Sequence, residues 1–151
     1  MITRATFGRL LPALAVAAAA SGAAAAPLDL PMDKPTTVNG IESVCTGIGD
    51  DATHNPLWKT YPLKIMLAGK GGQWLSDADV TVTLNGKPVV SVHCGGPWIL
   101  FKLQPGRYHV AGALEGDTAA SNVVVPAKGQ GRVVLRFRGE GGSLSPEHKP
   151  N

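Results

Sequence analysis

The sequence predicts an all-β protein, a seven-stranded antiparallel β-sandwich with Greek-key connections. Short runs of alternating apolar and polar residues recur along most of the chain, and this period of two is typical of strands with one buried face. Turn residues separate the runs at intervals of about 8 to 12 residues, the spacing expected of a sandwich. The pair Asn85-Gly86 stands between two such runs and is the strongest hairpin signal in the chain.

Residues 1–26 have the pattern of a bacterial secretory signal peptide. Arg4 and Arg9 flank the start, an apolar run follows at residues 10–20, and small residues lead to Ala26. Pro27 comes next, so no cysteine offers a thiol for a lipid anchor at that position. No later stretch approaches the roughly 20 apolar residues that a membrane span requires. We therefore expect a periplasmic or secreted protein with no membrane span.

The charge of the chain gives no sign of a nucleic-acid partner. There are 14 basic and 11 acidic residues, but two of the basic ones belong to the leader, so the remaining chain is nearly neutral. Its lysines and arginines are scattered singly or at alternate positions and form no basic stripe. Arg132 and Arg136, with Arg138, fit the solvent face of a strand.

The two cysteines, Cys45 and Cys94, are predicted to form a disulfide, because export brings both into an oxidising compartment. The alternative is a metal site that adds His93 or His54 to the two thiolates. Adjacent residues of a strand point to opposite faces, so His93 and Cys94 are badly placed to hold one ion. We predict the disulfide, no metal and no cofactor.

The chain is expected to divide into a lead-in, one domain and a tail. Residues 27–40 are rich in proline and predict an extended lead-in that serves as a tether. Residues 41–138 form the β-sandwich domain, and residues 139–151 have too few apolar side chains to pack and predict a disordered tail. A first short strand is expected at residues 41–45, and the seven runs that follow lie at residues 63–67, 79–84, 89–94, 98–103, 108–114, 122–125 and 133–137.

The stretch from Cys94 to Val110 is expected to be the central hairpin of the sandwich. Ile99, Phe101 and Leu103 alternate with outward positions, and Pro105-Gly106 supplies turn residues. A second alternation then begins on the far side of the turn. The two strands are predicted to pair with each other in one antiparallel sheet.

The longest irregular segment, Asp50 to Trp58, contains the candidate functional residues. Asp50, Asp51 and His54 are the one local gathering of acids and a histidine, which suggests metal or acid/base work. The alternative is that they cap helical turns and satisfy loop backbone groups. Trp58 and Trp74 are candidate anchors for a partner, since tryptophan is over-represented among the residues that dominate binding energy. Their alternative role is ordinary packing under a long loop.

One motif resembles a known family. The chain contains the pattern F-x-L-x-P-G-x-Y-x-V, formed by Phe101, Leu103, Pro105, Gly106, Tyr108 and Val110. On this motif the chain resembles the carboxypeptidase regulatory-like domains, sandwiches of transthyretin-like (prealbumin-like) topology, over about residues 61–137. The resemblance implies a core position for the Tyr108 ring, whose hydroxyl then needs a backbone partner. It also implies a non-catalytic module, an accessory or envelope protein that contacts an unknown protein or glycan of the cell envelope.

Two alternatives to the binding module are open. Transthyretin-like hydrolases that act on hydroxyisourate end in a Tyr-Arg-Gly-Ser tetrapeptide, which Phe137-Arg138-Gly139-Glu140 resembles only in part. The second alternative is a small metal-binding periplasmic protein. Because the sequence offers no convergent group of catalytic residues, we predict that the protein is not an enzyme.

The leader generates the first testable prediction. The exported chain is expected to begin within a residue or two of Pro27, because the small-residue pattern ends at Ala26. Intact-mass measurement of the exported protein checks this. A mass that retains residues 1–26 would remove the periplasmic assignment.

Overall fold

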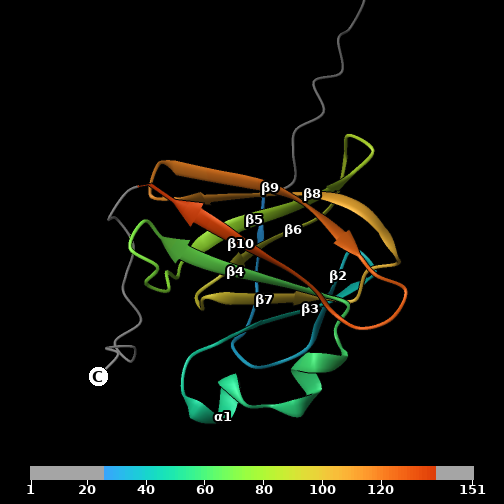
Figure 1. Ribbon diagram of the computed structural model, residues 1–151, viewed down its shortest axis with the longest axis horizontal. Helices are drawn as coiled ribbons and strands as arrows, with labels where there is room; N and C mark the ends of the chain where they lie inside the picture. Colours follow the sequence, from blue (N-terminus) through green and yellow to red (C-terminus); the bar gives the residue numbers. More distant parts are fainter. Residues whose placement is uncertain (1–25, 139–151) are drawn as a thin grey trace, which may run out of the picture.

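Two five-stranded sheets stack into a sandwich in the computed structural model, which describes residues 26–138 (Figure 1). One sheet has the order β1-β6-β5-β8-β9, and the other has the order β10-β4-β7-β3-β2. The strands are β1 (Leu28–Asp29), β2 (Thr36–Val38), β3 (Ile41–Thr46), β4 (Leu63–Gly69), β5 (Ala78–Leu84), β6 (Lys87–Cys94), β7 (Trp98–Phe101), β8 (Gly106–Leu114), β9 (Asp117–Val125) and β10 (Gly131–Phe137).

The all-β class is confirmed, but the sheets are mixed and the expectation of purely antiparallel pairing was wrong. β1 runs parallel to β6, and β10 runs parallel to β4. The expected lead-in does more than tether the chain, because β1 and β2 lie at its two ends and each forms the edge of a sheet. The predicted signal peptide, apart from Ala26, and the predicted tail lie outside the described residues.

The stretch from Trp98 to Val110 is not a hairpin, which corrects the sequence prediction. β7 lies in one sheet and β8 in the other, so Pro105-Gly106 carries the chain across the sandwich. The Tyr108 hydroxyl donates a hydrogen bond of 2.8 Å to the carbonyl oxygen of Gln104, which ties the crossing to the start of β8. The expectations for Tyr108, a buried ring and a backbone partner for its hydroxyl, are confirmed.

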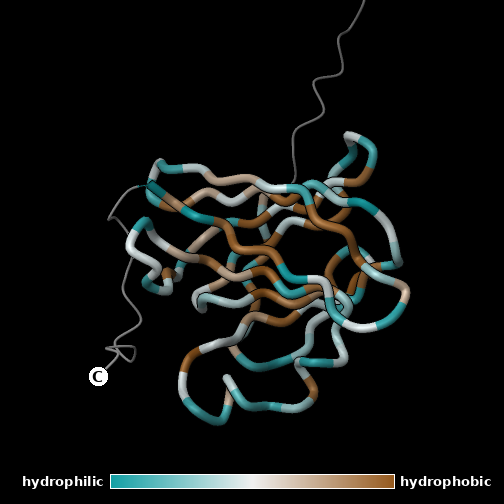
Figure 2. Tube along the Cα trace, viewed as in Figure 1, coloured by the Kyte–Doolittle hydropathy of each residue, from teal (hydrophilic) through white to brown (hydrophobic). Residues whose placement is uncertain are grey.

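The core lies between the two sheets, where hydrophobic residues concentrate (Figure 2). Burial alternates along β6 and β8 as the period-two pattern predicts, and Asn85-Gly86 does join β5 to β6. The largest fully buried side chains include Phe101 and Phe137. No helix of the described part is long and apolar enough to cross a membrane.

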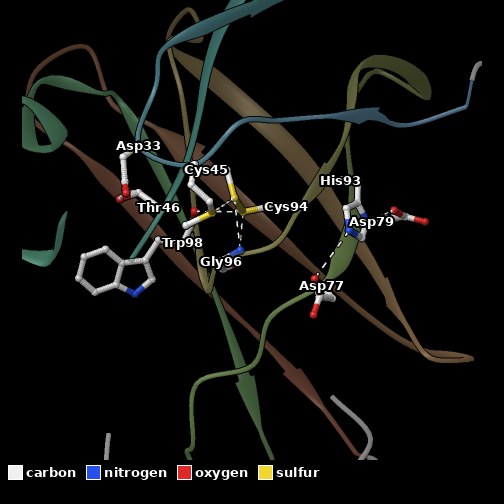
Figure 3. Close-up of a disulfide and its surroundings, with 10 residues drawn as sticks. Asp33, Cys45, Thr46, Asp77, Asp79, His93, Cys94, Gly96 and Trp98 are labelled. Carbon is white, nitrogen blue, oxygen red and sulfur yellow. Dashed lines mark hydrogen bonds and ion pairs between the residues drawn. A yellow bond between two sulfur atoms is a disulfide. The ribbon is translucent and has the colours of Figure 1, made fainter. Parts of the chain in front are cut away.

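The disulfide between Cys45 and Cys94 is confirmed, and it links the two sheets. Cys45 belongs to β3 and Cys94 ends β6, and both are fully buried with Cα atoms 5.4 Å apart (Figure 3). The backbone N–H of Gly96 donates to Cys45 Sγ at 3.3 Å. The covalent link therefore fixes one layer of the sandwich to the other.

Removing this link should destabilise the domain strongly. The bridge closes a loop of 49 residues, and closing a loop of that length stabilises by about 4 kcal/mol in the chain-entropy model. The double variant Cys45→Ala/Cys94→Ala is expected to lose about that free energy of unfolding in urea titrations. A loss below about 1 kcal/mol would show that the disulfide is dispensable for stability.

Candidate functional site

A short segment covers the outer face of the sheet that contains β7. This segment, residues 47–61, which we call the flap, holds the helix α1 (Asp50–Thr53) and the 3-10 helix η1 (Pro56–Thr60). It lies on the side of the sheet that faces away from the other sheet (Figure 1). Its residues Trp58 and Tyr61 pack against Val44 and Leu100 of the sheet in a second apolar cluster. The sequence placed Leu100 on an outward position, and the flap explains why it is fully buried.

Hydrogen bonds to the backbone hold the flap in place. Gln130, which precedes β10, donates from Nε2 to the carbonyl oxygens of Trp58 at 2.7 Å and Tyr61 at 3.0 Å. Asn55 caps η1, because its side-chain oxygen accepts from the N–H of Leu57 at 3.0 Å. The end of the flap is thus tied to a strand that lies about seventy residues further along the chain.

The flap begins at a position that only glycine fits. Gly47 has φ +104°, and an added Cβ would lie 2.9 Å from Pro97 Cγ and from two ring atoms of Trp98. Backbone in this region favours glycine. Gly47 therefore lets the chain leave β3 in close contact with the Trp98 indole.

The three polar candidates of the flap do not form a convergent group. Asp50 and Asp51 are exposed in the first turn of α1. His54 is exposed, and its Nδ1 lies 2.9 Å from the backbone oxygen of Asp50. The His54 ring thus contacts a backbone group of α1, whereas the N-cap of α1 is Gly49 and no side chain in the described part of the chain caps the helix. Within residues 26–138, no group of three or more His, Cys, Asp or Glu side chains is placed to hold a metal ion.

The tryptophan candidates have different surroundings. Trp58 is only 5% exposed and packs beneath the flap, which matches its packing alternative. Trp74 is half-buried, and its ring meets that of Trp98 edge to face with centroids 6.4 Å apart. Trp98, which the sequence placed on an outward strand position, is therefore the centre of this aromatic contact.

Lys64 and Arg132 bring two positive charges together beside these rings. They are partners in the parallel register of β4 and β10, and Lys64 Nζ lies 3.3 Å from the centroid of the Trp98 ring. Partial burial, with a further contribution from the charge of Arg132, lowers the pKa of Lys64 to about 8. Sequence analysis missed this pair, because only the pairing of β4 with β10 makes the two residues neighbours.

A small pocket of about 130 Å³ lies at this position, between the flap and the sheet. The indole N–H groups of Trp58 and Trp98 are both buried, and neither has a hydrogen-bond acceptor within the described part of the chain. An unpaired buried N–H is costly, so each indole is a polar group that the described chain leaves unsatisfied beside the pocket. The lining residues are Thr53, His54, Asn55, Trp58, Lys59, Lys64, Trp98, Gln130 and Arg132.

A second lysine on the same sheet is neutralised by a carboxylate. Lys102 Nζ lies 3.2 Å from both carboxylate oxygens of Glu42 and 5.2 Å from the centroid of the Tyr61 ring. The Tyr61 hydroxyl donates to Glu42 Oε1 at 2.5 Å. Hydrogen bonds from Tyr61 and then Lys102 lower the pKa of Glu42, while burial and the Glu42 carboxylate raise the pKa of Tyr61.

The other sheet also carries polar groups on its outer face. His93 points outward as predicted, but it is paired: its Nδ1 lies 2.8 Å from Asp79 Oδ1, and its Nε2 lies 3.9 Å from Asp77 Oδ1 (Figure 3). Sequence analysis missed this pairing. A β-bulge at the β5–β6 hairpin shifts the register so that Asp79 stands opposite His93.

A shallow groove of about 500 Å³ runs over the outer face of β8 and β9. It is lined by Arg107, His109, Asn122 and Val124, among others, and His109 is hydrogen-bonded to Asn122 at 3.0 Å. Because these polar groups partly satisfy one another, the groove makes a weaker candidate site than the pocket beneath the flap.

Comparisons with known proteins leave the family open. No protein-family model matches the chain, and no curated protein matches it either.

The depressed pKa of Lys64 predicts a pH dependence of stability. A lysine in the unfolded chain has a pKa of about 10.4, so between about pH 8 and that value the unfolded chain binds more protons than the folded one. The free energy of unfolding contributed by Lys64 therefore rises with pH across this window. Below it the lysine is charged in both states, and the cost of holding that charge is fully present.

Lys64→Met is expected to remove this rise. The charged and titratable groups that share the pocket, His54, Lys59 and Arg132, are common to both proteins and cancel in the difference. Urea titrations of the two proteins at pH values from about 7 to about 10 check the prediction. Parallel pH profiles would show that Lys64 titrates with an ordinary pKa.

Proposed function

We propose that the protein is a non-catalytic, exported β-sandwich module that contacts a protein partner of the cell envelope through the flap. The observation that carries the proposal is that the flap has both buried and exposed apolar side chains. Its Trp58 is buried, whereas its Leu57 is 58% and its Ile48 is 37% exposed. Exposed apolar side chains on a loop that is already ordered suit a protein contact, because binding then costs little further ordering.

The aromatic and cationic side chains beside the flap support the same surface. Trp74 and Trp98 are half-buried there, and Arg132 is exposed at the edge of the pocket. Tryptophan and arginine are the residues most enriched among those that dominate protein interfaces. The flap and its border thus combine the side chains that a binding surface needs.

Export and the finer fold assignment belong to the same proposal. The leader pattern at residues 1–26 and the buried bond between Cys45 and Cys94 are both typical of a periplasmic or secreted protein. The chain crossing at Pro105-Gly106, with the Tyr108 to Gln104 bond beside it, supports a Greek-key, transthyretin-like topology of the carboxypeptidase regulatory-like kind. In that family such a domain implies an accessory role, which matches the flap surface.

The proposal predicts that a charge on the flap abolishes the contact. Leu57→Asp places an unpaired carboxylate on the exposed apolar surface, so it should weaken binding to a partner in periplasmic extract at least tenfold, by about 1.4 kcal/mol or more. Val124→Asp is the matched control, because Val124 is 57% exposed on the opposite sheet.

The measurement is quantitative capture by the immobilised proteins, followed by mass spectrometry. A protein retained by the wild type and Val124→Asp but lost from Leu57→Asp supports the proposal. Loss from Val124→Asp alone would place the contact on the groove of β8 and β9 instead. A hydrolytic activity that disappears when Asp50, Asp51 and His54 are replaced together by Ala would overturn the non-catalytic assignment.

A further inference from the structure

Lys64 and Lys102 lie on the outer face of the sheet that contains β7, and only one of them has a carboxylate partner within residues 26–138. Lys102 is placed near the ring of Tyr61 and is neutralised by Glu42. Lys64 stands over the ring of Trp98, but its neighbour across the strands is Arg132. The first group is a cation, an aromatic ring and a carboxylate, whereas the second lacks the carboxylate.

The charge at Lys64 is left uncompensated within the described chain. The ion pairs of residues 26–138 join His93 to Asp77 and Asp79, and Lys102 to Glu42, and none involves Lys64. Arg132 donates from Nε to Gln130 Oε1 at 3.2 Å, which leaves its charge without a carboxylate. Like charges directly opposite in a sheet destabilise it, so an anion between them would relieve a cost that the folded chain bears.

Two residues with unsatisfied neutral donors also line the pocket. Trp58 Nε1 and Trp98 Nε1 are buried without acceptors, and both residues line the 130 Å³ space that Lys64 and Arg132 border. A carboxylate has two oxygens that together accept about four hydrogen bonds, and it pairs well with the planar guanidinium of arginine. The volume of about 130 Å³ admits a group of that size.

We propose that this pocket receives the carboxylate of an acidic side chain from the partner protein. This inference rests on the proposed function, since it assigns the part of the partner that the flap surface recognises. A polypeptide source is favoured over an acidic sugar, because the flap next to the pocket presents the aliphatic side chains Leu57 and Ile48. An acidic residue flanked by apolar residues would match both features.

The test uses the indole N–H signals of the full-length exported protein in ¹H–¹⁵N NMR spectra. The chain has three tryptophans, so each signal is assigned by single Trp→Phe variants. The probe is N-acetyl-glutamate α-amide, and N-acetyl-glutamine α-amide is its uncharged control. The charged probe should shift the Trp58 and Trp98 signals, whose residues line the pocket, leave the Trp74 signal nearly unchanged, and raise the pKa of Lys64. The uncharged probe should move none of them.

Matched variants separate the pocket from general charge. Lys64→Met should weaken binding of the charged probe about tenfold, since a hydrogen bond to a charged group contributes about that much. Lys102→Met removes the same charge from the paired site, so it should leave binding within about twofold of the wild type. Equal loss in the two variants would show that the probe responds only to net charge and would overturn the proposal.

Other probes and the capture assay decide the remaining alternatives. Tighter binding of inorganic phosphate than of the glutamate probe would overturn the assignment to a carboxylate, and tighter binding of glucuronate would overturn the polypeptide source. Partner capture that is lost in Leu57→Asp but unchanged in Lys64→Met would overturn this inference and leave the proposed function standing. If both variants still captured the partner while probe binding depended on Lys64, the proposed function would be overturned. The assignment of the carboxylate to a protein partner would then be wrong as well.

Discussion

The fold depends on the burial of β7 on both of its faces. Ile99 and Phe101 enter the core between the sheets, and Leu100, on the opposite face, is just as fully buried. A sandwich of two layers can cover only one face of each strand, so this chain needs a third layer. The flap supplies it, and the need to cover Leu100 and Val44 explains why an otherwise irregular segment is held by Gln130 from a distant part of the sequence.

Two lysines on the outer face of the sheet beneath the flap differ in how their charge is compensated. Lys64 stands over the ring of Trp98, and Lys102 lies near the ring of Tyr61. Taking part of an ammonium group out of water is costly unless charge or hydrogen bonds replace that water. At Lys102 the Glu42 carboxylate compensates the cost. At Lys64 no carboxylate of the described chain does so, and the protein therefore holds a locally unfavourable arrangement at the border of the flap. Local rules of stability are most often broken where a protein binds something.

Sequence patterns predicted the inward face of the strands, the Asn85-Gly86 turn and the disulfide, because each depends on short-range chemistry or on the redox compartment. They failed where two distant segments had to be matched. Pro105-Gly106 has the same turn chemistry whether the chain returns in one sheet or crosses to the other. The sequence therefore could not show that β7 and β8 lie in different sheets. The same limit hid the Lys64 and Arg132 pair. The single extra residue of the bulge likewise moved Asp79 opposite His93.

That bulge has a consequence for self-association. An edge strand with free N–H and C=O groups invites another chain to extend the sheet, and proteins blunt such edges with lysine, proline, bulges or short covering strands. β6 combines all four, since it begins with Lys87 and Pro88, is paired through the bulge, and is covered at residues 92–93 by β1. Backbone pairing along this edge is thereby discouraged, so another chain extends the sheet less readily from β6.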